Sequence, residues 1–179
     1  MSTRLVIFGL LRDQPLHGYE IKQIIEEQMG DWTSIAFGSI YFALGKLSKE
    51  GLIQMVATEK EGNRPSRSIY KITETGRLEF LRLLREVWNK PEQQYFAIDI
   101  GLAFMNALPA DEIKGYLHKQ VTQLEAILQY LDSHQQEQMS QPDIPNRAVV
   151  IFEHTRAHLN AELSWMKNVL EKIELGKLD

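Results

Sequence analysis

Cysteine is absent from the 179-residue sequence. Without a thiol the chain can form no disulfide, no thiolate nucleophile, and no zinc or iron–sulfur site with cysteine ligands. Histidine and carboxylate side chains are then the protein ligands that remain for a metal ion. The absence therefore excludes every class of enzyme that relies on thiolate catalysis.

Long apolar runs are also missing. Near the N-terminus the apolar run covers only about eight residues before Arg12 and Asp13, whereas a membrane-spanning helix needs about 20. This part of the chain has neither the basic leader nor the small-residue cleavage site of a secretory signal peptide. We therefore expect a cytoplasmic protein without a membrane partner.

Motifs of large enzyme classes are missing as well. The sequence has no GxSxG nucleophile elbow, no GxxxxGK[ST] phosphate loop and no GxGxxG turn after a strand. His154 and His158 stand four residues apart, with Glu162 one turn further, a spacing that can place three metal ligands on one helix face. Thr155, however, occupies the position of the glutamate general base in a zinc-protease helix, and neighbouring leucines favour a packing helix. We expect no enzyme, no cofactor and no metal site.

Basic charge is scarce overall and unevenly distributed. The chain is 44% apolar and 25% charged, as in an ordinary soluble globular protein, and its net charge is −4. Residues 1–90 carry 13 basic and 11 acidic side chains, a net +2, whereas residues 91–179 carry 7 and 13, a net −6. A basic front half can present a polyanion-binding face that the charge of the whole chain conceals.

The front half shows the pattern of three helices, a β-hairpin and a fourth helix. The predicted elements span residues 5–12, 18–30, 38–51, 52–57, 67–72 and 73–90. One apolar face of the fourth helix is formed by Leu78, Leu81, Leu84 and Trp88. The order is that of a winged helix-turn-helix module, whose third helix enters a DNA groove while the hairpin tip contacts the flanking backbone.

Three helices are predicted in the back half: an apolar one over Tyr95–Leu108 and two long ones after it. The two long helices run from Ala110 to about Gln138 and over Ala148–Leu175, and each carries an apolar seam, the second interrupted by Arg156. Together the seams present more apolar surface than one short tail can bury alone, which predicts a homodimer. The residues expected at the dimer contact are Leu124, Leu128, Leu131, Phe152, Leu159, Leu163, Met166, Leu170 and Ile173.

Four motifs follow one another in the front half. They are LHGYEI at 16–21, GSIYFAL at 38–44, LSKEGLI at 47–53 and RSIYKITETG at 67–76. In order and spacing they resemble the PadR family of bacterial transcriptional regulators, over roughly residues 4–85. The resemblance implies a sequence-specific DNA-binding homodimer, usually a repressor. Its helical C-terminal part completes the dimer and in some members senses a small molecule such as a phenolic acid or a drug.

The fold class that follows is mostly α. We expect a winged helix-turn-helix domain with a two-stranded wing over residues 1–90 and an all-helical dimerisation domain over residues 91–179. Where many PadR proteins begin the third helix with a polar cap and a proline, this chain has Ala36-Phe37, so either Ser34 caps the helix or its start frays. A twofold dimer should read an inverted repeat with half-sites about 10–10.5 base pairs apart, or a multiple of that spacing.

Candidate DNA contacts lie on the third helix and at the hairpin tip. Small side chains let the helix approach base edges, and lysines suit phosphates, while the polar tip can lay donors along phosphates or place an arginine in the minor groove. The candidates are Ser39, Tyr41, Phe42, Lys46, Lys49, Lys60, Asn63, Arg64, Ser66 and Arg67. The alternatives are a solvated helix face, a Tyr41 ring packed on the core, and a polar loop without a ligand.

An effector pocket is a further hypothesis, with Trp88, Tyr95, Phe96 and Asp99 as its candidate residues. The aromatic rings can line a flat pocket, but core and dimer packing is favoured for them. Asp99 interrupts an apolar segment, and a solvated or ion-paired carboxylate is favoured over a buried one. Three functions stay open: a repressor released by a small aromatic or drug-like effector, a ligand-independent regulator or activator, and a protein–protein adaptor without specific DNA binding.

Overall fold

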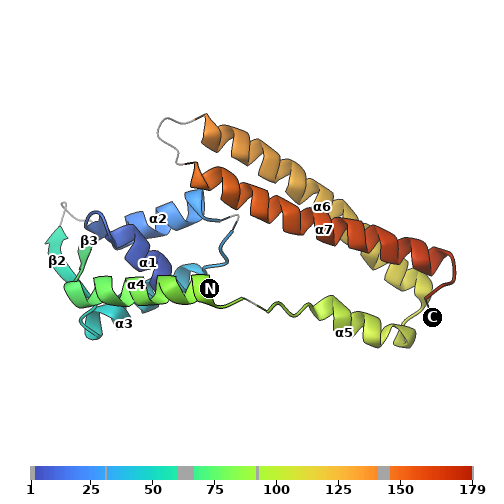
Figure 1. The fold of residues 1–179 in the computed structure, drawn as a ribbon, viewed down its shortest axis with the longest axis horizontal. Helices are drawn as coiled ribbons and strands as arrows, with labels where there is room; N and C mark the ends of the chain where they lie inside the picture. The colour runs from blue at the N-terminus through green and yellow to red at the C-terminus, as the bar shows by residue number, and fades with distance from the viewer. Residues whose placement is uncertain (1–2, 31, 60–66, 92, 141–145, 179) are drawn as a thin grey trace. The chain divides into compact units, whose positions relative to one another are not determined.

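A computed structural model describes residues 3–30, 32–59, 67–91, 93–140 and 146–178 (Figure 1). The chain divides into two compact units, Met1–Gln93 and Gln94–Asp179. Each unit is built around its own cluster of buried apolar side chains. Within the described residues, no helix is both long and apolar enough to cross a bilayer.

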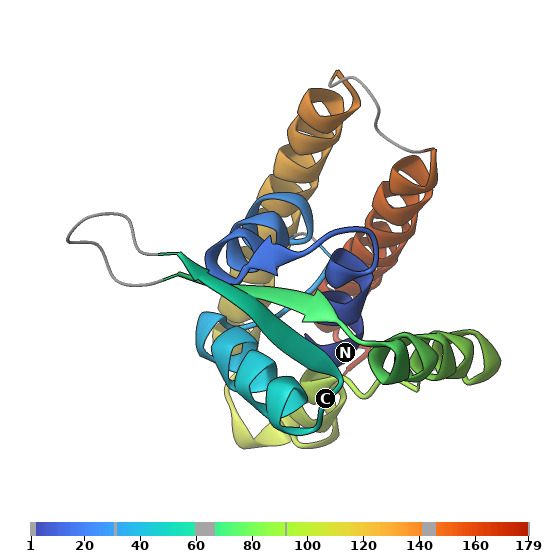
Figure 2. The same ribbon diagram turned by 90° about the vertical axis from the view of Figure 1, so that its left-hand side faces the viewer.

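The first unit contains helices and a small sheet. In chain order the helices are α1 (Thr3–Leu11), α2 (Gly18–Gln28), α3 (Phe37–Lys49) and α4 (Glu74–Asn89). Between α3 and α4 the strands β2 (Ile53–Glu59) and β3 (Arg67–Ile72) pair antiparallel, and Figure 2 shows them side by side. This order of elements confirms the predicted winged helix-turn-helix fold.

A third strand, β1 (Leu16–His17), extends the sheet. It pairs antiparallel with β3, with Leu16 opposite Tyr70 and His17 opposite Ile69, so the strand order is β1-β3-β2. The sequence predicted only the two hairpin strands, because a strand of two residues is too short to show an alternating pattern. The buried Leu16 side chain also contributes to the core.

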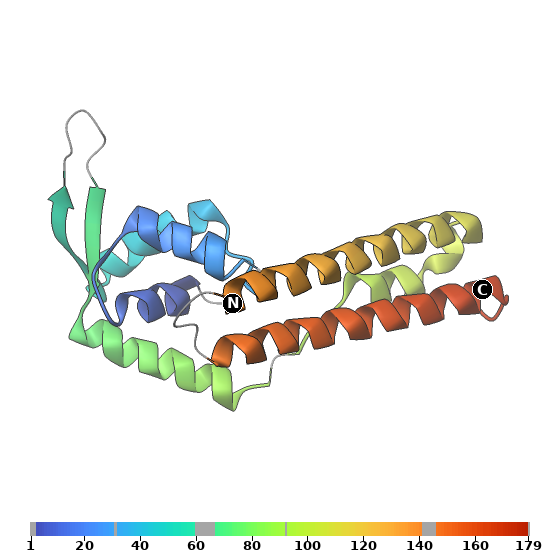
Figure 3. The same ribbon diagram turned by 90° about the horizontal axis from the view of Figure 1, so that it is seen from above.

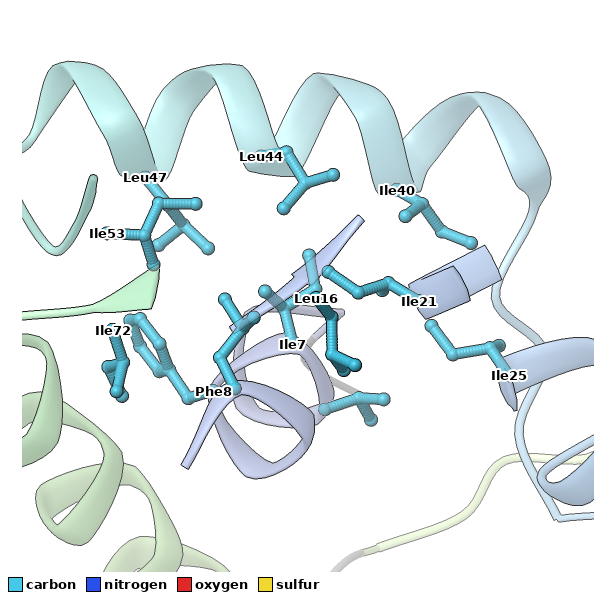
Figure 4. Packing of buried hydrophobic residues seen from close by; sticks show 12 residues of the cluster. Ile7, Phe8, Leu16, Ile21, Ile25, Ile40, Leu44, Leu47, Ile53 and Ile72 are labelled. Carbon is cyan, nitrogen blue, oxygen red and sulfur yellow. The ribbon is translucent and has the colours of Figure 1, made fainter. Parts of the chain in front are cut away.

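The core of the first unit lies between α3 and the first two helices (Figure 4). Ile40, Leu44 and Leu47 recur every three to four residues, so one face of α3 points inward and all three side chains are buried. They pack in one cluster with Ile7 and Phe8 of α1, both fully buried. Because the inner face is fixed by this packing, the direction of the outer face is fixed as well.

The start of α4 is tied to the end of α3. The Thr73 hydroxyl oxygen accepts a hydrogen bond from the Gly76 amide at 3.1 Å, which caps α4, and it lies 2.8 Å from the Gly51 carbonyl, to which it donates. Gly51 follows α3 with φ of 71°, a left-handed conformation that glycine adopts without strain. The Thr73 amide also donates to the Leu52 carbonyl at 3.1 Å. One threonine therefore joins the end of α3, the first residues of the hairpin and α4.

We expect Thr73→Ala to lower the free energy of unfolding of the first unit by about 1–2 kcal/mol, because α4 loses its cap and the Gly51 carbonyl loses a donor. Thr73→Ser keeps the hydroxyl and should stay within about 0.5 kcal/mol of the parent. Urea unfolding followed by far-ultraviolet circular dichroism measures both. Equal losses in the two variants would contradict a stabilising role for the hydroxyl.

The apolar face predicted for α4 does not lie on the core of the unit. Leu78 and Leu81 are exposed and Trp88 is 84% exposed, whereas Phe80 and Leu83 pack against the core cluster. The helix carries two apolar stripes, and the 3.6-residue period does not say which of them faces inward. The packing of α4 on α1, where the Phe80 ring lies beside Gly9, decides which stripe faces inward.

The second unit is helical throughout its described residues. Its elements are α5 (Ala97–Ala103), the short 3-10 helix η1 (Met105–Ala107), α6 (Ala110–Met139) and α7 (Arg147–Glu174). Figures 1 and 3 show α6 and α7 side by side and running in opposite directions. Leu117 of α6 and Val169 and Ile173 of α7 form the buried cluster, against which α5 and η1 pack through Ile98, Leu102 and Met105.

Both apolar seams of the back half are partly covered within the single chain. Buried side chains on them are Leu131, Phe152, Met166 and Ile173, and half-buried ones are Leu124, Leu128, Leu159, Leu163 and Leu170. The helices α6 and α7 of one chain thus pack on each other and bury part of both seams, while five of the nine predicted residues keep part of their surface exposed. The dimer contact itself stays a prediction.

Arg156, which interrupts the seam of α7, crosses to α6. Its Nε and Nη2 atoms donate to Asp132 Oδ1 at 2.9 and 2.7 Å, and Nη2 also donates to Gln135. The guanidinium is thus hydrogen-bonded where the seam would otherwise place an apolar side chain. Arg156 thus replaces an apolar contact of the seam with hydrogen bonds to α6.

Candidate nucleic-acid interface

The outer face of α3 is exposed and partly basic. Lys46 and Lys49 are exposed in the last turns of the helix, and Phe42 is 75% exposed between them and the helix start. A Cβ atom added at Gly38 or Gly45 would meet no other atom within 4 Å. The face therefore combines two cations, one large apolar side chain and open backbone positions at which another molecule can approach closely.

The start of α3 has no side-chain cap. Ala36 occupies the N-cap position, and no side chain accepts a hydrogen bond there. The expectation that Ser34 caps the helix is therefore wrong. The Ser39 hydroxyl donates to the Ala36 carbonyl at 2.6 Å, and the Ser39 amide donates to the same oxygen at 2.9 Å. A phosphate accepts hydrogen bonds, so Ser39 would have to release this bond to donate to one. As placed, its hydroxyl is free to accept only.

The Tyr41 ring is partly packed on its own unit and partly exposed. A Cβ atom added at Gly18 would lie 3.2 Å from Tyr41 Cε1, so the ring packs against the start of α2, yet the side chain remains 43% exposed. Its ring also stands edge-on to Phe37, with ring centroids 5.3 Å apart. Tyr41 is therefore anchored on one side and open to a ligand on the other.

Two residues beside the start of α3 were not identified from the sequence. Lys22 Nζ of α2 lies 4.5 Å from the centroid of the Phe37 ring, a cation–π distance, and 3.4 Å from the Glu26 carboxylate. Phe37 is itself exposed. The sequence did not indicate a role for Lys22, because it lies on the polar face of α2. Only the packing of α2 on α3 brings it beside the start of α3.

A hollow of about 250 Å³ lies between α1 and α3. It is lined by Thr3, Arg4, Ser39, Phe42, Ala43, Lys46 and Leu47. Arg4 pairs with Glu50 at the end of α3, so a cation from the first turn of α1 borders the same surface as Lys46. Sequence reasoning missed Thr3 and Arg4, since nothing local indicates that α1 begins beside the outer face of α3.

Only the base of the wing is described. Glu59 of β2 is opposite Arg67 of β3, and a register shift between Met55 and Ala57 bends the pair. Met55 and Val56 on β2 are exposed. The predicted tip residues Lys60, Asn63, Arg64 and Ser66 lie outside the described residues, as does the side chain of Arg67.

The four candidate effector residues are exposed. Trp88 and Tyr95 are each 84% exposed, Phe96 is 49% exposed, and Asp99 in the first turn of α5 is exposed too. The solvated interpretation of Asp99 agrees with this position. Trp88 belongs to the first unit and the other three to the second.

An apolar cavity of about 440 Å³ lies elsewhere, between α5, η1 and α6. It is lined by Ile98, Ile100, Gly101, Leu102, Phe104, Met105, Ala107, Leu108, Ile113, Tyr116, Leu117 and Gln120. At its edge the Tyr116 hydroxyl donates to Glu112 at 2.7 Å, and this hydrogen bond to a carboxylate raises the pKa of Tyr116 above its ordinary value. None of the four sequence-predicted residues lines this cavity. The sequence did not reveal it, because it forms where three consecutive elements fold over one another.

Comparison with known proteins gives a consistent set of relatives. Residues 7–82 match the model of the transcriptional regulator PadR-like family. The negative transcriptional regulator PadR of Bacillus subtilis (strain 168) is 26% identical over 178 residues, which are 96% of this chain and 97% of that protein. The match therefore extends well beyond the winged helix.

Solved structures share the whole fold. Bacillus subtilis PadR in complex with operator DNA superposes with a TM-score of 0.78 at 24% identity, covering 95% of this chain and 98% of the other. The same protein in complex with p-coumaric acid gives a TM-score of 0.73 at 22% identity, covering 96% and 94%. A winged helix followed by a helical unit is thus common to all of them.

Proposed function

We propose, from the premise that this chain belongs to the PadR-like family of transcriptional regulators, that it binds operator DNA as a homodimer through α3 and the wing. Members of this family are regulators of transcription and not enzymes. The operator would be an inverted repeat read by two copies of α3. Repression is the favoured outcome, because the Bacillus subtilis relative is a negative regulator.

The outer face of α3 carries the proposal. Its inner face is fixed by three buried side chains, so Phe42, Lys46 and Lys49 are presented on a rigid element and not on a loop. A helix with cations and small residues on its free face suits a DNA major groove, where lysines contact phosphates and small residues allow close approach. The predicted wing residues would add contacts beside it.

Dimerisation is supported by apolar surface in the second unit. Ile100, Phe104, Leu108 and Tyr116 are exposed large side chains at the cavity between α5, η1 and α6. A contiguous exposed apolar patch of this kind is typical of a surface that another protein covers. A single winged helix makes too few phosphate contacts for tight binding, and a dimer doubles their number. Of the predicted dimer residues, Leu170 and Ile173 pack in the cluster of Leu117, which lines this cavity.

An effector is the finer part of the proposal. The Bacillus subtilis relative has been solved with p-coumaric acid, a small aromatic acid. Trp88, Tyr95, Phe96 and Asp99 remain candidates for binding such a compound, with ligand-independent regulation as the alternative. A compound that releases DNA would be displaced from the protein by saturating operator, since the coupling of two ligands is reciprocal.

The test is fluorescence-anisotropy binding to the DNA upstream of the chain's own gene, at two salt concentrations, with a scrambled duplex as control. We expect tighter binding to the native duplex by about 10³-fold or more, a fall in affinity with salt, and two chains per duplex. Analytical ultracentrifugation of the complex gives the stoichiometry. Equal and weak binding to both duplexes would instead favour the protein–protein adaptor.

A further inference from the structure

Two histidines on α7 face each other on the exposed side of the helix. His154 and His158 are four residues apart and both exposed. Their Nε2 atoms are 3.2 Å apart, and the ring centroids are 4.6 Å apart at an interplanar angle of 71°. One Nε2 atom donates a hydrogen bond to the other, so an ion that binds both nitrogens would take the place of the shared proton.

The distance between these atoms is that of two ligands on one metal ion. Two imidazole nitrogens bound at about 2.0–2.1 Å to a tetrahedral zinc ion lie about 3.3 Å apart. Adjacent ligands in a square or octahedral copper or nickel complex lie about 2.9 Å apart at the same bond length. The observed 3.2 Å falls between these values, so little movement of either ring is needed to admit an ion.

The surroundings leave room for an ion and hold the helix in place. Ala157 and Ala161, the residues beside the pair on the same side of α7, are small and exposed. On the opposite side Phe152 and Met166 are buried, which fixes the backbone that carries the pair. The backbone positions of the two ligands are thus fixed, which lowers the ordering cost of binding an ion.

The site has two protein ligands and no more within the described chain. No group of three or more His, Asp or Glu side chains in those residues could hold a metal ion, so Glu162 is not brought to the pair. Water would fill the remaining coordination positions. A two-histidine site selects borderline transition metals over magnesium or calcium, because imidazole is a poor ligand for hard cations.

We propose that His154 and His158 chelate one divalent transition-metal ion per chain, with Cu²⁺ bound more tightly than Ni²⁺ or Zn²⁺, the order expected for nitrogen ligands. The ion bridges one turn of α7 and bonds to both nitrogens only when the helix is folded, so it stabilises the second unit. The site shares no residue with the outer face of α3, and the proposal stands whether or not the chain binds DNA.

The experiment is calorimetric titration of the untagged full-length protein with CuCl₂, ZnCl₂ and MgCl₂ in a non-chelating buffer. The variants are His154→Gln and His158→Gln, since glutamine suits an exposed helix position and the fold is kept. The matched control is His118→Gln, which removes a single exposed histidine from α6. Circular dichroism without metal verifies that all four proteins are equally helical.

We expect one Cu²⁺ per chain for the parent and for His118→Gln, weaker Zn²⁺ binding and no Mg²⁺ binding. Each α7 variant should bind Cu²⁺ at least tenfold more weakly. At ZnCl₂ about tenfold above its Kd, the Tm of the second unit should rise by about 6–11 °C in the parent and much less in either α7 variant. Absence of Cu²⁺ binding by the parent, undiminished binding by both α7 variants, or a loss confined to one of them would overturn the proposal, because a chelate needs both rings.

Discussion

Gly76→Ala is expected to lower the free energy of unfolding of the first unit by about 3 kcal/mol or more. A Cβ atom at this position would lie 2.0 Å from the Leu52 carbonyl oxygen and 2.9 Å from Ile72 Cγ1. The obstructing atom is backbone, and its oxygen is already bonded to the Thr73 amide. The start of α4 therefore cannot move away from Leu52 without breaking the hydrogen bond between the Thr73 amide and the Leu52 carbonyl.

Ordinary helix propensity would predict the opposite sign. Alanine is favoured over glycine inside a helix by about 1 kcal/mol, so the overlap has to exceed this gain for the variant to be destabilised. Gly115→Ala in α6 is the matched control, because no atom lies within 4 Å of an added Cβ there, and it should be neutral or stabilising by up to about 1 kcal/mol. Urea unfolding of both variants gives the two signs. A stabilised Gly76→Ala would show that α4 does not approach β2 so closely in solution.

Lys46→Glu is expected to weaken operator binding by at least tenfold and by considerably more at low salt. Lys46 lies exposed on α3 beside the hollow that Arg4 borders, so charge reversal places a carboxylate where the proposed dimer meets two phosphates, one per subunit. Neutralisation in Lys46→Ala should lower the slope of log K against log salt by about one for each phosphate that the protein no longer neutralises. Anisotropy titrations over a salt series measure both.

Lys119→Glu provides the control for charge. It makes the same change at an exposed position of α6 in the other unit, and it should leave operator affinity within about twofold if α3 is the contact. Circular dichroism should be unchanged in all three variants, because neither lysine contributes to a core. Equal affinity for the Lys46→Glu and Lys119→Glu proteins would remove α3 from the DNA surface.

The long helices could be predicted closely because their patterns are long. Ala110 to about Gln138 and Ala148–Leu175 were expected, and α6 (Ala110–Met139) and α7 (Arg147–Glu174) are observed. Over some thirty residues a 3.6-residue period is repeated many times, whereas β1 has two residues and shows no period at all. Proline residues at 109, 142 and 145 also mark where the helices cannot continue.

Tertiary contacts could not be predicted in the same way. The hollow beside Lys46 depends on where α1 begins relative to α3, and the place of Lys22 depends on how α2 packs on Phe37. Each is a relation between residues far apart in the chain, which a local pattern does not encode. The outward direction of Phe42 and Lys46 could be predicted, because it follows from the buried positions of the same helix.

The polar bridge between α6 and α7 also determines which alignment of the two helices is stable. Leucines spaced three and four residues apart would match nearly as well if one helix slid past the other by a heptad, about 10 Å. In the slipped alignment Arg156 would leave Asp132 and Gln135, and the loss of this partly exposed ion pair would cost about 0.5–1 kcal/mol. Lys167 and Glu125 form a second ion pair between the same helices, so two polar contacts favour the observed alignment and Arg156→Leu would remove one of them.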